Sequence, residues 1–171
     1  MSTLNLRTKH ILVVDDAATV RMYHRKMLGD AGWQIEEAVN GMEALEKIAQ
    51  RGTKPSFDLF VSDINMPRMD GYAFVRALRA LGSQSSAAGR DDTVLQAPVL
   101  MVSTEAQAHD ADAAFAAGAN AYLVKPARPA ELVLTVALML GDHEAALRAA
   151  RDMAKGGNRR ISAPTPGGRQ Q

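Results

Sequence analysis

The sequence predicts an α/β fold: one parallel sheet of five strands, with helices packed on both of its faces. Short apolar runs alternate five times with longer segments in which apolar residues recur every three to four positions. A helix between two such strands makes a right-handed crossover and places the strands parallel. The predicted strands are His10–Val14, Gln34–Val39, Asp58–Ser62, Pro98–Val102 and Ala121–Val124, and the predicted helices are Ala18–Gly29, Gly41–Gln50, Tyr72–Leu81, Gln107–Ala117 and Glu131–Leu140.

The apolar content of a predicted strand indicates its place in the sheet. The first, third and fourth strands contain the runs Ile-Leu-Val-Val, Leu-Phe-Val and Val-Leu-Met-Val, which suit strands buried on both faces. The second strand, Gln-Ile-Glu-Glu-Ala-Val, is more polar, so we expect it at an edge. The segments between strands have the apolar spacing of helices that pack one face against a sheet. Together these features predict a doubly wound sheet.

The overall composition is that of a globular protein, and it excludes several classes of function. Of the 171 residues, 47% are hydrophobic and 23% are charged, which is enough to bury a single core. The chain has no cysteine, which excludes disulfides, thiolate metal ligands and cysteine nucleophiles. A net charge of +1 argues against a general affinity for nucleic acid. No leader peptide or membrane-spanning stretch is visible, so we expect a cytoplasmic protein with no membrane or nucleic-acid partner.

We expect one domain over residues 9–141, preceded by an N-terminal extension at 1–8. Within the domain, residues 82–96 are polar, and the stretch is longer than the roughly 2–6 residues usual between a helix and a strand. We therefore predict a flexible loop insertion there. Residues 142–155 have the pattern of an extra helix, and residues 156–171 have the composition of a disordered tail.

Polar side chains gather where the predicted strands end. In an open parallel sheet, ligands bind outside the carboxyl ends of the strands, at the point where the chain reverses its direction of winding. Any one of these residues alone is explained equally well as a turn, a helix cap or a strand terminator. Their occurrence together indicates a site. The residues are Asp15, Asp16, Asp63, Ser103, Thr104 and Lys125.

The residue types in this cluster suit phosphoryl chemistry. Three carboxylates close together repel one another unless a cation joins them. Mg²⁺ prefers oxygen ligands and is commonly completed by a substrate phosphate, and Mn²⁺ is an expected substitute. Lys125 offers a positive charge to a phosphoryl oxygen, and Ser103 offers a hydrogen bond. A carboxylate beside Mg²⁺ and a lysine is a competent nucleophile toward phosphorus, so the cluster predicts phosphoryl transfer to an Asp.

Four separated stretches resemble bacterial response-regulator receiver domains, especially the single-domain regulators of the CheY type. The resemblance covers roughly residues 9 to 141, and the motifs stand in the family's order. It implies a flavodoxin-like (βα)5 fold with strand order 2-1-3-4-5, and a stand-alone phosphorylation-controlled binding module rather than an enzyme. The stretches are Ile-Leu-Val-Val-Asp-Asp (11–16), Val-Ser-Asp-Ile-Asn-Met-Pro-Arg-Met-Asp-Gly (61–71), Val-Leu-Met-Val-Ser-Thr-Glu-Ala (99–106) and Gly-Ala-Asn-Ala-Tyr-Leu-Val-Lys-Pro (118–126).

The resemblance implies a role for each matching residue of the acidic cluster. Asp63 is implied to be the phosphoacceptor, with a histidine kinase or a phosphotransfer protein as donor. Asp16, Asp63 and the backbone carbonyl of Asn65 are implied to bind Mg²⁺, with Asp15 acting through a water molecule. Lys125 is implied to contact the phosphoryl group.

The resemblance also implies switch positions. Ser103 matches the hydroxyl that is drawn to the phosphoryl group, and Tyr122 matches the aromatic residue that then turns inward. Asn65 and Glu105 match members whose phosphoryl group is short-lived. These matches imply that phosphorylation switches a protein-binding surface made by the fourth helix, the fifth strand and the fifth helix, in two-component or chemotaxis-like signalling.

Two other functions remain open from the sequence. Chemotaxis regulators present lysines to the flagellar switch at positions that are Gln107 and Ala108 here, so a phosphorelay intermediate without motor binding is an alternative. A metal-dependent phosphatase with an Asp nucleophile is the other. That class usually has a general-acid Asp near the nucleophile, whereas Asp63 is followed by Ile64 and Asn65.

The last predicted helix of the domain has a second apolar side. At about 100° per residue, Leu134 and Leu138 lie roughly opposite the side that should pack on the sheet, with Ala137 beside them. We predict that these three residues and Tyr122 form a surface for a second copy or a downstream protein. The other explanation is that the 142–155 segment folds back and covers them.

Overall fold

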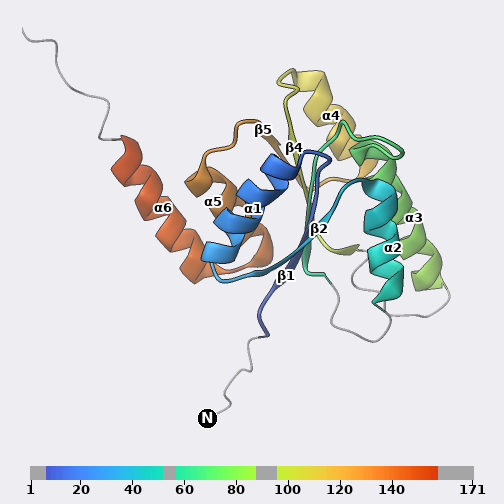
Figure 1. The fold of residues 1–171 in the computed structure, drawn as a ribbon, viewed down its shortest axis with the longest axis horizontal. Coiled ribbons are helices and arrows are strands. Elements are labelled where there is room, and N and C mark those ends of the chain that lie inside the picture. Colours follow the sequence, from blue (N-terminus) through green and yellow to red (C-terminus); the bar gives the residue numbers. More distant parts are fainter. Residues whose placement is uncertain (1–6, 52–56, 88–95, 158–171) are drawn as a thin grey trace, which may run out of the picture.

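The computed structural model describes residues 7–51, 57–87 and 96–157. Strands and helices alternate along the chain, and a further helix follows the fifth strand–helix unit (Figure 1). In chain order the elements are β1 (His10–Val14), α1 (Ala18–Asp30), β2 (Gln34–Ala38), α2 (Gly41–Gln50), β3 (Leu59–Ser62), α3 (Gly71–Ala87), β4 (Val99–Ser103), α4 (Ala108–Ala117), β5 (Ala121–Val124), α5 (Pro129–Leu140) and α6 (His143–Gly157).

The five strands form one parallel sheet in the order β2-β1-β3-β4-β5, which confirms the predicted flavodoxin-like topology. The chain winds first toward β2 and then in the other direction through β3, β4 and β5. The reversal places the carboxyl ends of β1 and β3 side by side, where Val14 is paired with Ser62. β2 lies at the edge, as its polar sequence predicts.

Alternate residues of each strand supply two apolar layers, one on each face of the sheet. On β1, Leu12 and Val14 belong to the cluster that includes residues of α2, α3 and α4. Ile11 and Val13 belong to the cluster that includes residues of α1, α5 and α6. Figure 1 shows the same division, with α1, α5 and α6 on one side of the sheet and α2 and α3 on the other. Burial on both faces explains why the central strands are continuously apolar.

The largest departure from the predicted boundaries is in α3. It runs to Ala87, so residues 82–87 of the predicted flexible loop are helical. Extending an existing helix fixes one residue for each new hydrogen bond, whereas starting a helix fixes several for the first bond. The Ser83 hydroxyl also donates to the carbonyl of Arg79 at 3.1 Å. Residues 88–95 of that predicted loop lie outside the described residues, as do residues 1–6 of the predicted extension and 158–171 of the predicted tail. Residues 156 and 157, predicted as part of the tail, belong to α6.

The additional helix α6 packs against α5 and is anchored at its start. Ala145, Ala146 and Ala149 are buried along one side of the helix. The Asp142 carboxylate accepts a hydrogen bond from the Ala145 backbone N–H at 3.0 Å and another from the Trp33 indole Nε1 at 3.0 Å. Trp33 precedes β2, so α6 begins at the end of the sheet opposite the strand ends that carry Asp15 and Asp63. None of the helices described is long and apolar enough to cross a bilayer.

His24 on α1 is a buried polar residue that makes stability depend on pH. Its side chain is 3% exposed, and its Nδ1 has no hydrogen-bond partner among the described residues. Burial lowers the pKa of His24 from 6.5 to about 4; nearby Asp15 opposes the shift and Lys125 adds to it. Between those two pH values the unfolded chain binds a proton that the folded protein does not, so stability falls as the pH drops.

The unfolding free energy of the wild type should fall between pH 6.5 and pH 5. In His24→Leu we expect this fall to be smaller by about 2 kcal/mol. Urea denaturation of both proteins at the two pH values, in EDTA, measures the difference. His109→Leu, at an exposed position on α4, is the control and should keep the wild-type pH dependence. An unchanged pH dependence in His24→Leu would show that His24 is not the source.

Candidate functional site

The candidate site lies at the carboxyl ends of β1 and β3. Asp15 and Asp63 directly follow the paired residues Val14 and Ser62. The backbone N–H of Asp63 donates to the carbonyl of Val14 at 2.8 Å, and that of Asp15 donates to the carbonyl of Ala38 at 3.1 Å. The sheet hydrogen bonds therefore continue one residue beyond the strands and hold the two aspartates side by side.

Asp16 completes a cluster of three carboxylates. One oxygen of Asp15, one of Asp16 and one of Asp63 all lie within 4.8 Å of one another. Asp15 and Asp63 are buried, whereas Asp16 is exposed. Hard divalent cations such as Mg²⁺ prefer such a set of oxygen ligands, and a cation relieves the repulsion among the three charges. The residues present therefore fit a divalent metal ion.

Lys125 reaches the same cluster from the end of β5. Its Nζ donates to Asp15 Oδ2 at 2.7 Å and lies 3.2 Å from Asp63 Oδ1. Its backbone N–H donates to the carbonyl of Ser103 at 2.7 Å, which ties it to the end of β4. Burial alone would lower the pKa of Lys125, but the hydrogen bond with Asp15 and the charges of Asp15 and Asp63 raise it. The ammonium group is thus held charged between the two buried carboxylates.

The Asp63 carboxyl has an unusual electrostatic setting. Burial raises its pKa above the ordinary value, the charge of Lys125 opposes the shift, and the charge of Asp15 adds to it. Compared with a surface aspartate, this carboxylate has little water to stabilise its charge. The Lys125 ammonium, 3.2 Å away, takes over part of that role, and a divalent ion bound by the three carboxylates would take over more.

Four further predicted residues meet at the rim of the cluster, around Glu105. Ser103 is fully buried, and its Oγ accepts a hydrogen bond from the Glu105 backbone N–H at 3.1 Å. The Tyr122 hydroxyl donates to the Glu105 carbonyl at 2.7 Å. Asn65 Nδ2 donates to Glu105 Oε1 at 3.4 Å. The structure therefore links the residues predicted as switch positions to those predicted to tune dephosphorylation.

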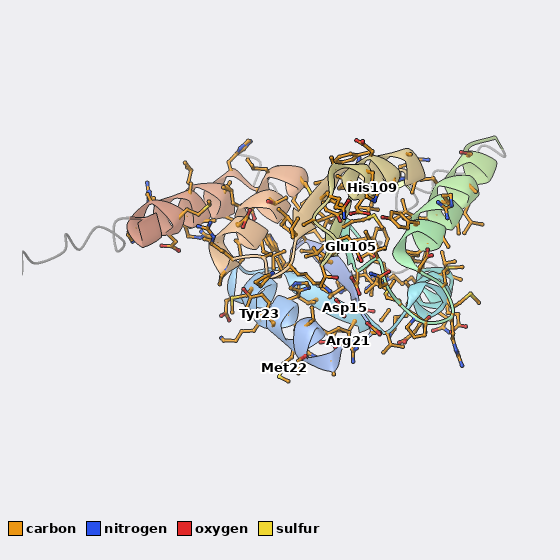
Figure 2. The ribbon with its side chains drawn as sticks, turned by 90° about the horizontal axis from the view of Figure 1, so that it is seen from above. Asp15, Arg21, Met22, Tyr23, Glu105 and His109 are labelled. Carbon is orange, nitrogen blue, oxygen red and sulfur yellow. The ribbon has the colours of Figure 1, made fainter. Side chains whose placement is uncertain are left out.

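One residue of the site is absent from the sequence prediction. Arg21, on α1, donates from Nη1 to the carbonyl oxygens of Asp15 at 2.8 Å and Asp16 at 3.1 Å. Figure 2 shows Arg21 beside Asp15 at the start of α1. The only signal in the sequence is its place in the second turn of the helix that follows the two aspartates, and an arginine there is equally consistent with a solvated helix face.

The predicted partner surface on α5 is only partly exposed. Leu138 is 63% exposed, whereas Leu134 and Tyr122 are half-buried. Ala137 is fully buried, so its assignment to that surface was wrong. It belongs to the same apolar cluster as Ala145 of α6, which packs along this side of α5. The helix at 143–157 therefore covers part of the second apolar side of α5, for which the sequence allowed either a partner or this segment.

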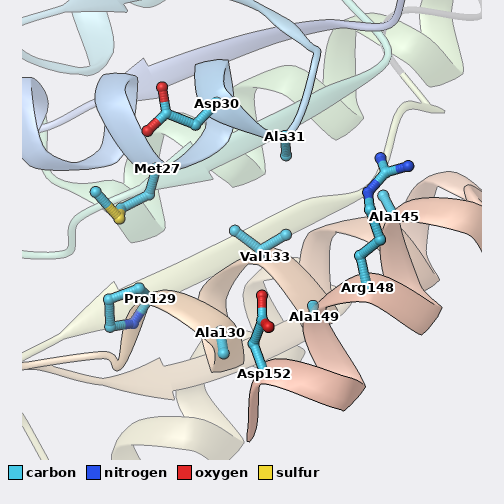
Figure 3. A pocket seen from close by; sticks show the side chains of 10 residues that line it. All are labelled: Met27, Asp30, Ala31, Pro129, Ala130, Val133, Ala145, Arg148, Ala149 and Asp152. Carbon is cyan, nitrogen blue, oxygen red and sulfur yellow. The ribbon is translucent and has the colours of Figure 1, made fainter.

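α6 also closes one side of a cavity of about 320 Å³ that lies between α1, α5 and α6 (Figure 3). Met27, Val133 and Ala149 contribute apolar walls, one from each helix, and the side chains of Asp30 and Asp152 also line it. The cavity contains none of the predicted site residues. α6 therefore contacts the domain mainly through α5 and does not pack closely against α1.

Comparisons with known proteins agree with this arrangement. The model of the response regulator receiver domain family matches residues 11–137. Chemotaxis protein CheY1 of Helicobacter pylori is 33% identical over 136 residues, which are 78% of this chain and 98% of that protein. Transcriptional regulatory protein PrrA of Mycobacterium leprae is 38% identical over 130 residues, 76% of this chain but 49% of that protein. The solved structure of chemotaxis response regulator CheY4 of Vibrio cholerae has a TM-score of 0.64 and 38% identity, covering 78% of this chain and 99% of that one.

The family match spans the whole site and stops short of α6. It includes the three carboxylates and Lys125, and it ends at residue 137, within α5. The fold, the acidic cluster and the lysine are thus those of a receiver domain. The chain belongs to the response regulator receiver domain family.

Proposed function

We propose that the chain accepts a phosphoryl group on Asp63 from a histidine kinase or a phosphotransfer protein, in a Mg²⁺-dependent reaction. The observation that carries this proposal is the position of the Asp63 carboxylate, 3.2 Å from the Lys125 ammonium and within 4.8 Å of two further carboxylates. This set of groups combines a nucleophile, a metal site and a positive charge for a phosphoryl oxygen. The chain then passes the signal on through the surface of α4, β5 and α5.

In this proposal each residue has a separate task. An oxygen of Asp63 forms the bond to phosphorus while the bond from phosphorus to the donor's imidazole nitrogen breaks. Asp15, Asp16, Asp63 and the backbone carbonyl of Asn65 would hold Mg²⁺, which when bound neutralises charge on the phosphoryl oxygens. Lys125 is held by Asp15 within reach of Asp63, so it can bind a phosphoryl oxygen without leaving the site.

The contacts around Glu105 support a route from the site to the surface. Ser103 Oγ accepts a hydrogen bond from the Glu105 backbone N–H and is also hydrogen-bonded to the Tyr122 side chain, so donating its proton to a phosphoryl oxygen would change both contacts. Movement of Ser103 would disturb the Glu105 backbone, to which the Tyr122 hydroxyl donates. Asn65 and Glu105, which are hydrogen-bonded to each other at 3.4 Å, would tune the lifetime of the phosphoryl group.

Incubation with acetyl phosphate and Mg²⁺, followed by intact-mass measurement, tests the proposal. We expect a mass increase of one phosphoryl group that requires Mg²⁺ and disappears in EDTA. Sustained hydrolysis of an aryl phosphate with many turnovers, and no labelled protein, would favour the phosphatase alternative.

The metal and phosphoryl roles of the site are separable by two substitutions. Asp16→Ala removes a proposed metal ligand, so Mg²⁺ affinity and phosphorylation should both fall. Lys125→Ala removes a positive charge that contacts two of the carboxylates, so Mg²⁺ binding should be kept or strengthened, while the response to phosphorylation is lost. Calorimetric titration with Mg²⁺ measures the Mg²⁺ affinity of both variants. If Lys125→Ala lost Mg²⁺ and Asp16→Ala kept it, the two roles would be the reverse of those proposed.

The binding surface is tested at Leu138, the exposed leucine of α5. Burying one such side chain contributes about 1.5–3 kcal/mol, so Leu138→Glu should weaken association with a second copy or a target protein by at least tenfold. Sedimentation with and without beryllofluoride, a phosphoryl mimic, measures self-association. Leu147→Glu, at a 59% exposed position on α6, is the matched control and should leave it unchanged. If the chain is a monomer both with and without beryllofluoride, the partner is a different protein. The effect of Leu138→Glu is then measured on capture of that protein.

A further inference from the structure

We propose that Arg21 is a positioning residue for the metal site: it holds the backbone of the β1–α1 loop so that the carboxylates of Asp15 and Asp16 converge on one ion. The inference rests on the proposed function, because it concerns the Mg²⁺ site of that function. In this role Arg21 contacts no phosphoryl group and supplies no metal ligand. It contributes by holding the shape of the loop.

The geometry that supports this role is a single nitrogen shared between two consecutive carbonyl groups. Arg21 Nη1 donates to the Asp15 oxygen at 2.8 Å and to the Asp16 oxygen at 3.1 Å. Two successive peptide planes are therefore turned toward the same point. Because a charged donor makes stronger hydrogen bonds than a neutral one, this contact restrains the loop more than water would.

The guanidinium group is itself fixed from the neighbouring strand. Arg21 Nε donates to Glu37 Oε2 at 3.3 Å, and the Arg21 side chain is only 15% exposed. Glu37 belongs to β2, which pairs with β1. The loop is thus connected through Arg21 to the edge of the sheet, and the Glu37 carboxylate offsets the positive charge that Arg21 brings toward the metal site.

Asp16 is the residue whose position depends most on this restraint. The Asp15 carboxylate has its own anchors, since it accepts from Lys125 Nζ and from the Ala17 backbone N–H. The Asp16 carboxylate is exposed and makes no hydrogen bond with the described residues. Its place beside the other two carboxylates is therefore determined by the backbone that carries it, which is the part that Arg21 holds.

The charge of Arg21 and its positioning role predict opposite effects on metal binding. If the charge alone mattered, its removal would strengthen Mg²⁺ binding, because a positive group near the site would be gone. If positioning dominates, its removal weakens Mg²⁺ binding, because the ligands lose their arrangement before the ion arrives. Residues that orient metal ligands typically change affinity by about 10–100-fold. The sign of the change therefore separates the two roles.

Calorimetric titration of the full chain with Mg²⁺ tests the proposal in three variants. We expect Arg21→Ala to raise the dissociation constant about tenfold. Arg21→Lys, which keeps the charge but lacks the planar group that donates to the loop and to Glu37, should lie between Arg21→Ala and the wild type. Arg25→Ala is the matched control: Arg25 also pairs with Glu37, at 3.4 Å, but is 66% exposed and makes no contact with the loop carbonyls, so affinity should not change.

A second readout distinguishes positioning from a general loss of structure. With acetyl phosphate, the phosphorylation rate of Arg21→Ala should return to within about twofold of the wild-type rate once Mg²⁺ is saturating, because the weakened step is metal binding. An unchanged or lower dissociation constant in Arg21→Ala, or a rate defect that saturating Mg²⁺ does not relieve, would overturn the inference. If the wild-type chain bound no Mg²⁺ at all, the proposed function would fail first, and the two failures are therefore distinguishable.

Discussion

Replacing Asp63 by Asn is expected to abolish phosphorylation completely while the protein still folds. The amide has nearly the same shape as the carboxylate, but it carries no charge and does not form the acyl phosphate. Burial already raises the pKa of Asp63, so removing its charge also removes a desolvation penalty. Lys125 keeps its shorter bond to Asp15, at 2.7 Å. We therefore expect cooperative melting near the wild-type temperature and no phosphoryl mass increase with acetyl phosphate and Mg²⁺.

The control for this experiment is another aspartate that lies outside the cluster. Asp112 is exposed on α4, and Asp112→Asn should be labelled as fully as the wild type. Labelling of Asp63→Asn at the wild-type level would show that a different carboxylate accepts the phosphoryl group. Asp16, which is exposed beside Asp63, would then be the first residue to examine.

Gly71→Ala is expected to cause the largest loss of stability among single substitutions near the site. A Cβ at this position would lie 2.2 Å from the carbonyl oxygen of Asp63 and 3.0 Å from the Cα of Ile64. Both atoms belong to the backbone, so neither can move without displacing the loop that carries Asp63. We expect the unfolding free energy to fall by about 3 kcal/mol and the melting temperature by roughly 6–12 °C. Phosphorylation should also slow, because relief of the clash moves the nucleophile.

Gly29 on α1 provides the matched control. A Cβ there would have no heavy atom within 4 Å. Alanine favours a helix over glycine by roughly 0.5–1 kcal/mol, so Gly29→Ala should raise the melting temperature slightly. Thermal unfolding of the two variants beside the wild type measures both effects. Equal melting temperatures for Gly71→Ala and the wild type would mean that the β3–α3 loop rearranges freely around Asp63.

The sequence was sufficient to predict the sheet and the acidic cluster because both depend on short-range patterns. Continuous apolar runs mark strands buried on both faces, and a polar residue directly after such a run must lie at the carboxyl end of its strand. Asp15 and Asp63 were predictable in this way, and the paired register of Val14 and Ser62 confirms that they are neighbours. Lys125 follows from the same reasoning applied to β5.

Features that depend on contacts between distant segments were harder to predict. The burial of Ala137 depends on where α6 packs, and its position on a helical wheel does not contain that information. The role of Arg21 depends on the carbonyl groups of two residues in the preceding loop, which have no signature in the sequence. The extension of α3 to Ala87 occurs because a helix already formed tolerates residues that would not start one.

The hydrogen bond between Trp33 and Asp142 gives this protein a built-in optical reporter. Trp33 is the single tryptophan of the chain, so all indole emission comes from the junction between β2 and the start of α6. That junction lies at the end of the sheet remote from Asp63. Intrinsic fluorescence should therefore record whether α6 stays docked, whereas ion binding and phosphorylation at the other end of the sheet should leave the emission spectrum nearly unchanged.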